Sequence, residues 1–175
     1  QLRNTRVMYY YGIDCGLSGG VVCLDANGEI VISRTMPILS DGKSRIIDIG
    51  SLATLFAEIG RHPNSQKFIV ENPGGHAPSA AGLRSMTYSF AVVETLLVAN
   101  KLQHHIVTAQ RWQKQFWSRP QMPKGKKFNT KAAALLAAGK IWPAEQWLAT
   151  DRCRKAHDGM VDAALIAEYG RRQSI

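Results

Sequence analysis

The chain has 175 residues, of which 45% are hydrophobic and 20% are charged. This length and composition predict a soluble globular protein, with one domain over residues 1–175 and a sizeable core. The sequence contains no apolar run of about 18 residues, so it predicts no membrane-spanning helix and no membrane partner. The net charge of +9 instead favours a polyanionic partner, and nucleic acid above all.

The three cysteines, Cys15, Cys23 and Cys153, lack the spacing of a metal site. Their odd number argues against a disulfide framework and for a reducing compartment. Cys15 is expected to be a packing residue rather than a nucleophile. The chain begins at Gln1 without a methionine, so the sequence does not allow a targeting segment to be judged.

The apolar and turn-forming residues predict a mixed series of elements. An antiparallel meander comes first, because Asp25-Ala26-Asn27-Gly28-Glu29 is a strong hairpin signal. The expected strands are 8–14, 20–25, 30–36, 67–71 and 103–107, and the expected helices are 45–60, 82–101, 109–117, 131–138, 143–148 and 158–171. This order predicts an α/β fold with a mixed five-stranded sheet, a three-strand antiparallel meander plus two parallel strands, flanked by helices.

Four acidic residues lie where a strand or helix end meets a loop: Asp14, Glu71, Asp158 and Asp162. Asp158 and Asp162 are four residues apart, so they share one face of the last helix, and their like charges repel. A divalent cation would relieve that repulsion, and oxygen ligands suit Mg²⁺ or Mn²⁺ rather than zinc. Two other interpretations stay open at this stage: Asp158 as a helix N-cap, and Glu71 as the partner of an arginine.

The turn Gly16-Leu17-Ser18-Gly19-Gly20 follows Asp14 directly. Glycine lets the backbone turn sharply, and we expect it to keep the space beside Asp14 open for a metal ion and a bulky anion. The alternative is an ordinary hairpin in which the aspartate caps the turn.

Four motifs in this order resemble the RNase H-like superfamily, and within it the RuvC-like Holliday junction resolvases of the bacteriophage and organellar type. They are G-I-D-C-G-L-S-G-G at 12–20, I-V-E-N-P at 69–73, N-T-K-A-A at 129–133 and H-D-G-M-V-D-A-A-L-I-A at 157–167. Together they span nearly the whole chain. The first motif alone is also shared by sugar kinases and actin-like ATPases.

The resemblance implies that Asp14, Glu71, Asp158 and Asp162 are catalytic metal ligands, and that Lys131 helps to hold the scissile phosphate or the active-site water. This chain departs from bacterial RuvC-type sequences at one point. In those sequences the last two ligands are three residues apart. In this chain the residue three positions before Asp162 is Gly159, which cannot be a side-chain ligand. Either Asp158 or His157 would then be the ligand that precedes Asp162.

The activity that the resemblance implies is hydrolysis of DNA phosphodiesters with two Mg²⁺ ions about 4 Å apart, for which Mn²⁺ can substitute. Its products would carry a 5′-phosphate and a 3′-hydroxyl. The substrate would be branched DNA, chiefly four-way junctions, cut by a homodimer with two active sites. The helix over 82–101 offers an apolar face for that dimer. The expected location is cytoplasmic, at the nucleoid of a bacterium or phage-infected host, or organellar if a targeting peptide has been removed.

Basic and wedge-forming side chains are expected to bind the DNA without reading its sequence. The candidates are His76, Arg84, Met86, Lys114, Arg119, Lys124, Lys126 and Lys127. The four tryptophans, by contrast, are expected to pack in the core.

Three other functions stay open from the sequence. The first is an actin-like or sugar-kinase-like ATPase, although such proteins need two domains of this kind. The second is a branched-DNA-binding protein without catalysis. The third is an RNase H-like nuclease that acts on RNA–DNA hybrids or on other nucleic acids.

Overall fold

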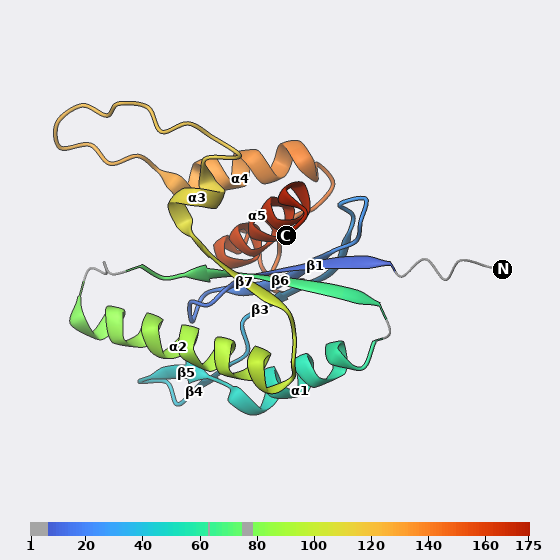
Figure 1. Ribbon diagram of the computed structural model, residues 1–175. Helices are drawn as coiled ribbons and strands as arrows, with labels where there is room; N and C mark the ends of the chain where they lie inside the picture. Colours follow the sequence, from blue (N-terminus) through green and yellow to red (C-terminus); the bar gives the residue numbers. More distant parts are fainter. Residues whose placement is uncertain (1–6, 63, 75–78) are drawn as a thin grey trace.

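The computed structural model describes residues 7–62, 64–74 and 79–175. Its main sheet has five strands in the order β3-β2-β1-β6-β7 (Figure 1). These strands are β1 (Met8–Asp14), β2 (Gly20–Leu24), β3 (Ile30–Thr35), β6 (Ser65–Asn72) and β7 (His104–Thr108). A separate two-stranded sheet consists of β4 (Ile38–Ser40) and β5 (Arg45–Ile47). The helices are α1 (Ile49–Gly60), α2 (Ala80–Ala99), α3 (Ala109–Gln113), α4 (Thr130–Ile141) and α5 (Asp158–Gln173).

The pairing of the strands confirms the predicted mixed sheet. β1, β2 and β3 form the antiparallel meander, while β1 pairs with β6, and β6 with β7, in parallel. Because the carboxyl ends of parallel strands meet at one edge of a sheet, Asp14 at the end of β1 and Glu71 near the end of β6 lie at the same edge.

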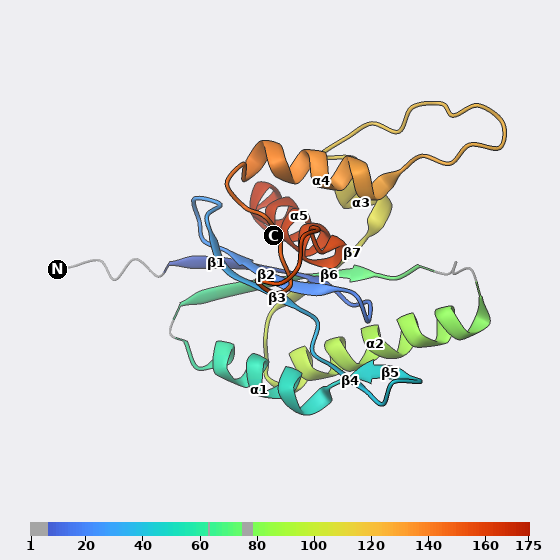
Figure 2. The ribbon, with the colours of Figure 1, turned by 180° about the vertical axis from the view of Figure 1, so that it is seen from behind.

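The helices cover both faces of the sheet. α1 and α2 lie on one face together with β4 and β5, whereas α5 lies on the other face with α4 packed over it (Figures 1 and 2). Each face has its own apolar cluster. No helix in the described part of the chain is long and apolar enough to cross a bilayer.

Strand alternation decides which face each carboxylate occupies. Ile13 lies in the core under α1 and α2, whereas Gly12 faces the backbone of α5. Since side chains alternate along a strand, Asp14 shares the α5 face with Gly12. Ile69 packs in the core under α5, so Glu71, two residues later, also points to that face. Both carboxylates therefore lie on the side of the sheet that α5 covers.

α5 lies unusually close to the sheet because glycines remove side chains at the contact points. A Cβ on Gly12 would overlap the backbone of Ala163, and one on Gly159 would overlap the carbonyl oxygen of Ser18. A Cβ on Gly20 would lie 2.9 Å from the carbonyl oxygen of Gly159. The first turn of α5 is thereby held against the turn that follows Asp14. The helix is buried on nearly all sides from Gly159 to Gly170, although this stretch includes the carboxylates Asp162 and Glu168.

The structure differs from several of the predicted elements. Residues 45–47 form β5 rather than the start of a helix, because Asp48 is the N-cap of α1 and accepts a hydrogen bond from the Ser51 amide at 3.0 Å. The helix predicted over 109–117 ends at Gln113. Residues 143–148 are not helical, since Trp147 is buried with a φ of 56°, which an α-helix does not allow.

Candidate active site

A cavity of about 460 Å³ lies between the first turn of α5 and the turn after β1. It brings together four of the five residues that the sequence predicted to be catalytic. The cavity is lined by Asp14, Gly16, Ser18, Lys131, Ala156, His157, Asp158, Gly159 and Asp162. Residues that lie far apart in the chain, on β1, α4 and α5, thus contribute to one site.

Asp14 is held at the mouth of the glycine turn. Its Oδ1 accepts a hydrogen bond from the Gly16 amide at 3.0 Å, which fixes the carboxylate against the backbone. Burial raises the pKa of Asp14, while this hydrogen bond and the nearby His157 and Lys131 act in the opposite direction. Burial outweighs them, so the folded protein stabilises the charge of Asp14 less well than water does.

Glu71 is the second half-buried carboxylate. Burial, followed by the negative charge of Asp14, raises its pKa to about 7. The indole N–H of Trp112 donates a hydrogen bond to Glu71 Oε2 at 2.7 Å and partly offsets that effect. The sequence interpretation that Glu71 pairs with an arginine is therefore wrong, because its partner is a neutral donor.

Asp162 is the third carboxylate. Burial and the charges of Asp14 and Glu71 raise its pKa to about 8, and Lys131 lowers it, but by less. The three carboxylates come from β1, β6 and α5, and the charge of Asp14 raises the pKa of both others.

Asp158 differs from these three because it is exposed and paired. Lys131 Nζ lies 2.5 Å from Asp158 Oδ2, and both side chains are more than half exposed. The ion pair raises the pKa of Lys131. His157 rather than Asp158 is the N-cap of α5, since His157 Nδ1 accepts from the Met160 amide at 3.3 Å. The N-cap interpretation of Asp158 is therefore wrong, and one ring nitrogen of His157 is already used.

The glycine turn does not simply leave space beside Asp14, as the sequence suggested. Gly16 does line the cavity, where a Cβ would lie 3.4 Å from Asp14 Oδ1. Gly19 and Gly20, by contrast, are packed. A Cβ on Gly19 would overlap the carbonyl oxygen of Asp14, and Gly20 contacts α5. Most of the turn therefore allows close packing, and only its first glycine borders the site.

The donor set fits a hard divalent cation. In the described part of the chain no three His, Cys, Asp or Glu side chains are already placed to hold a metal ion, and Glu71 is bonded to Trp112 and Asp158 to Lys131. Even so, three half-buried carboxylates lie close together: the charge of Asp14 raises the pKa of Glu71 and Asp162, while Lys131 lowers that of Asp14 and Asp162. Burying such charges is costly unless a cation compensates them. Oxygen-only ligands of this kind suit Mg²⁺ or Mn²⁺.

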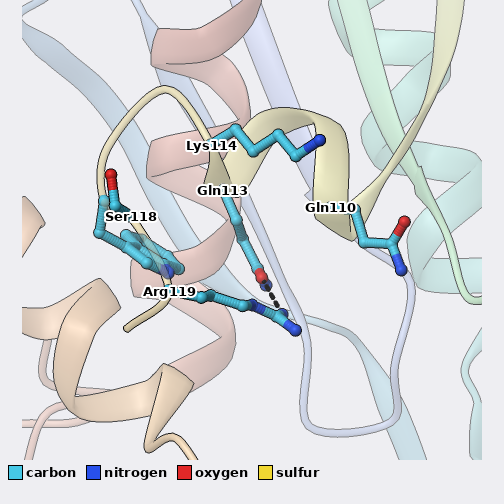
Figure 3. Close-up of a pocket in the computed structure, with 6 residues that line it drawn as sticks. Gln110, Gln113, Lys114, Ser118 and Arg119 are labelled. Carbon is cyan, nitrogen blue, oxygen red and sulfur yellow. Dashed lines mark hydrogen bonds between the residues drawn. The ribbon is translucent and has the colours of Figure 1, made fainter. Parts of the chain in front are cut away.

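The predicted DNA-binding residues fall into separate groups. Lys114 and Arg119 line a second cavity, of about 510 Å³, together with Gln110, Gln113, Trp117 and Ser118 (Figure 3). Arg119 Nη2 donates to Gln113 Oε1 at 2.6 Å. Lys124, Lys126 and Lys127 are exposed on the loop between α3 and α4, which projects from the edge where α2 begins (Figures 1 and 2).

The remaining candidates lie on or before α2. Arg84 is exposed on its first turns, next to a shallow apolar pocket that also includes Tyr88. Met86 is half-buried, so it is a weaker candidate for a wedge between bases. His76 lies outside the described residues.

The structure adds two residues that the sequence did not single out. Trp112 was expected to be a core residue, which it is, but its indole also bonds Glu71. Arg45 donates from Nη2 to the Leu17 carbonyl at 2.6 Å, beside the cavity wall at Ser18. Each contact joins residues far apart in the sequence, so local sequence patterns could not have predicted either of them.

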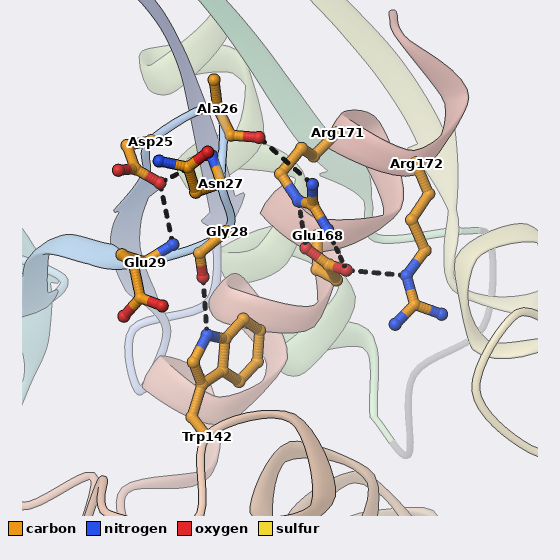
Figure 4. A network of polar contacts seen from close by, with 9 residues as sticks. All are labelled: Asp25, Ala26, Asn27, Gly28, Glu29, Trp142, Glu168, Arg171 and Arg172. Atoms are coloured by element: carbon orange, nitrogen blue, oxygen red, sulfur yellow. Dashed lines mark hydrogen bonds and ion pairs between the residues drawn. The ribbon is translucent and has the colours of Figure 1, made fainter.

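Arg171 and Arg172, in contrast, are engaged at the far end of α5. Both bond the buried Glu168, with nitrogen–oxygen distances of 2.7 Å (Figure 4). Arg171 also donates to the Ala26 carbonyl, and Trp142 Nε1 donates to the Gly28 carbonyl at 2.8 Å (Figure 4). This network ties the end of α5 to the β2–β3 hairpin and takes these two arginines out of the set available for DNA.

We predict that the metal-free protein becomes less stable as the pH rises from about 5 to about 8. Glu71 and Asp162 keep their protons in the folded state up to about pH 7 and 8, whereas unfolded carboxyls lose theirs near pH 4. The folded state therefore binds more protons in this window, and the free energy of unfolding falls with rising pH. Urea denaturation in EDTA at several pH values measures this slope.

Asp162→Asn should flatten that slope and stabilise the metal-free protein at pH 8, because the amide carries no charge. Asp41→Asn is the matched control. Asp41 is exposed, and hydrogen bonds from the Ser44 and Lys43 amides lower its pKa, so this change should not flatten the slope. An unchanged slope in Asp162→Asn would contradict the carboxylate coupling.

Comparisons with known proteins identify the fold. No protein-family model matches the chain, and no curated protein matches it either. Among solved structures, RuvC of Thermus thermophilus in complex with a Holliday junction substrate superposes with a TM-score of 0.54 and 11% sequence identity, over 95% of this chain and 96% of that one. A second T. thermophilus RuvC structure gives the same TM-score and identity over 95% and 97%. The chain therefore has a RuvC-like fold, within the RNase H-like class.

Proposed function

We propose that this protein is a divalent-cation-dependent endodeoxyribonuclease that resolves four-way DNA junctions. The observation that carries this proposal is geometric: Asp14 and Asp162 line one cavity with Lys131 and Asp158, and Glu71 is close enough for its charge to raise the pKa of Asp162. The RuvC-like fold supports it, since one of the similar structures is a complex with a Holliday junction substrate. The net charge of +9 suits a DNA ligand.

Asp14, Glu71 and Asp162, with Asp158 beside them, would hold two Mg²⁺ or Mn²⁺ ions. When bound, the cations supply Lewis-acid activation of water and neutralise the charge that develops on the leaving 3′ oxygen. The protein's own part is to bring these carboxylates together at one edge of the sheet, beside the first turns of α5. Hydrolysis would leave a 5′-phosphate and a 3′-hydroxyl.

Lys131 would bind the scissile phosphate by exchanging partners. In the free protein its ammonium pairs with Asp158, and both groups are largely in water. Exposed ion pairs contribute only about 0–1 kcal/mol, so a DNA phosphate can replace Asp158 at little cost. The exchange would leave the Asp158 carboxylate available to a cation. We therefore favour Asp158 over His157 as the ligand ahead of Asp162.

The DNA would lie along the edge from which the α3–α4 loop and the start of α2 project (Figure 1). The exposed cations at this edge are Arg84, Lys114, Arg119, Lys124, Lys126 and Lys127. Such side chains bind phosphates irrespective of base sequence. We propose that they place the branch point over the cavity and that Arg45 adds a contact at the turn after β1.

Asp14→Asn should reduce cleavage of a synthetic four-way junction to background while leaving junction binding in EDTA unchanged. The amide keeps the shape of the side chain but removes the charge that would hold a cation. Glu58→Gln is the matched control, because it removes an exposed carboxylate from α1 on the other side of the sheet. Equal cleavage by Asp14→Asn and wild type would contradict the assigned site.

The wild-type protein with Mg²⁺ should cleave a four-way junction in preference to a linear duplex and to an RNA–DNA hybrid of the same length. Gel analysis of end-labelled strands reports both the preference and the symmetry of the cuts. Preference for the hybrid would instead make the protein an RNase H-like nuclease on other substrates. Junction binding without cleavage by any cation would make it a branched-DNA-binding protein.

Removing the positive charges of the α3–α4 loop should weaken DNA binding and make it less dependent on salt concentration. For Lys124→Gln, Lys126→Gln and Lys127→Gln combined, the slope of log K against log salt should fall by about 0.9 for each phosphate that the loop no longer neutralises. Arg61→Gln with Lys101→Gln is the control, since these exposed cations follow α1 and α2. An unchanged slope in the loop variant would show that the loop does not bind phosphate.

Cutting two symmetric strands requires two active sites, so we propose a homodimer. The exposed face of α2 offers an interface through Ala91, Thr95, Val98 and Ala99, with Val92 half-buried beside them. Light scattering should give twice the chain mass of 19.3 kDa. Val98→Glu should yield monomers, whereas Leu136→Glu, at a similarly exposed position on α4, should not. A monomeric wild type would contradict the dimer.

A further inference from the structure

Trp112 makes a contact that packing alone does not require. Its side chain is fully buried, with none of its surface exposed, in the core between α5 and the sheet. The indole N–H is the donor of the 2.7 Å hydrogen bond to Glu71 Oε2. Buried indoles usually find an acceptor for the N–H, although those of Trp117 and Trp147 have none within the described residues. Here that acceptor is one of the carboxylates proposed to hold the cations.

The position of the indole is rigidly determined. Trp112 lies on α3, which begins at Ala109, directly after β7 ends at Thr108. β7 pairs in parallel with β6, and Val107 is the register partner of Glu71. The indole also packs edge-on against Trp117 and Phe116, with ring centroids 5.6 and 6.3 Å away. The donor is therefore held by the same sheet that holds the acceptor.

The chemistry of this donor suits a metal ligand. An arginine or lysine in its place would bring a positive charge and compete with a cation for the carboxylate. The indole N–H is neutral and donates a single hydrogen bond. It can fix Oε2 and the plane of the carboxylate while the second oxygen, Oε1, makes no hydrogen bond within the described residues. Donors that orient metal ligands in this way commonly change metal affinity or activity by about 10- to 100-fold.

We propose that Trp112 is a positioning residue for Glu71, orienting its carboxylate for a divalent cation. This inference rests on the proposed function, in which Glu71 is a ligand. Trp112 does not touch substrate and takes part in no proton transfer. It acts only by limiting the orientations of the Glu71 side chain, so the free carboxylate is already aligned when the cation arrives.

Trp112→Phe tests this role because phenylalanine keeps an aromatic ring but has no N–H. Trp142→Phe is the matched control. Trp142 is also buried, also donates its indole N–H, to Gly28, and also packs edge-on against another tryptophan, Trp147. Both changes therefore remove one buried hydrogen bond and similar ring volume. Only one of the two bonds ends on a carboxylate of the proposed site.

The first readout is Mn²⁺ binding without DNA, measured by electron paramagnetic resonance of the free ion. We expect Trp112→Phe to bind Mn²⁺ about 10- to 100-fold more weakly than wild type, and Trp142→Phe to bind as wild type does. In the Glu71→Gln background, Trp112→Phe should have no further effect. Equal Mn²⁺ binding by Trp112→Phe and wild type would overturn the inference, as would an equal loss in Trp142→Phe.

A second readout uses wild-type protein, so it does not depend on the folding of Trp112→Phe. The indole ¹H–¹⁵N signals of the four tryptophans can be assigned by elimination, using Phe variants of the other three. The Trp112 signal should move on addition of Mg²⁺ and in Glu71→Gln, while the Trp142 signal stays in place. A Trp112 signal that is unchanged in both cases would overturn the inference.

These results separate the inference from the proposed function. If wild type binds Mn²⁺ and Trp112→Phe binds it weakly, but no junction is cut, the proposed substrate is wrong and the role of Trp112 stands. If wild type cuts junctions and Trp112→Phe binds Mn²⁺ normally, the role of Trp112 is wrong and the function stands. If wild type binds no Mn²⁺, both are wrong.

Discussion

The close approach of α5 to the sheet is the contact on which the site depends. It is made at Gly12, Gly20 and Gly159, where a Cβ would overlap or crowd a facing backbone. Because the backbone of α5 lies so close to the sheet, the Asp162 side chain lies beside Asp14 and Glu71. With side chains between helix and sheet it would be farther away. Burial in this position, followed by the charges of Asp14 and Glu71, raises the pKa of Asp162. The glycines thus act mainly by bringing a helix to a carboxylate.

Buried carboxylates that repel one another oppose folding, so other parts of the structure must stabilise their placement. Two apolar clusters, one on each face of the sheet, provide most of the burial. At its far end, α5 is tied to the β2–β3 hairpin through Glu168, Arg171 and Arg172 (Figure 4). There the two arginines outweigh burial and lower the pKa of Glu168. The carboxylate at this end of α5 is therefore compensated by two arginines, whereas at the other end Asp162 lies beside Asp14 and Glu71, which raise its pKa.

α3 has a short sequence but two distinct faces. Trp112 points inward to Glu71, whereas Gln110, Gln113 and Lys114 border the outer cavity with Arg119 (Figure 3). The hydrogen-bond donor to Glu71 and two proposed phosphate-binding cations, Lys114 and Arg119, therefore lie on α3 and the segment that follows it. Since α3 follows directly on β7, the sheet fixes both faces relative to the cavity at Asp14. DNA contacts and catalytic geometry are thus supported by the same element.

The order of strands and helices and the five-stranded sheet could be predicted from the sequence, because periodicity and turn residues are local signals. The sequence also indicated that Asp14 and Glu71 each end a strand, but their shared edge appeared only from the parallel pairing of β1 with β6. The glycine packing, the N-cap at His157, the pairing of Lys131 with Asp158 and the contact of Trp112 with Glu71 could not be predicted in this way. These features depend on three-dimensional packing. It brings distant segments together and decides which of two neighbouring residues makes a contact. By itself the sequence determined which carboxylates could form a site, and the tertiary structure decided how close they lie and which neighbours hold them, because desolvation and hydrogen bonding depend on what the folded chain places around each group.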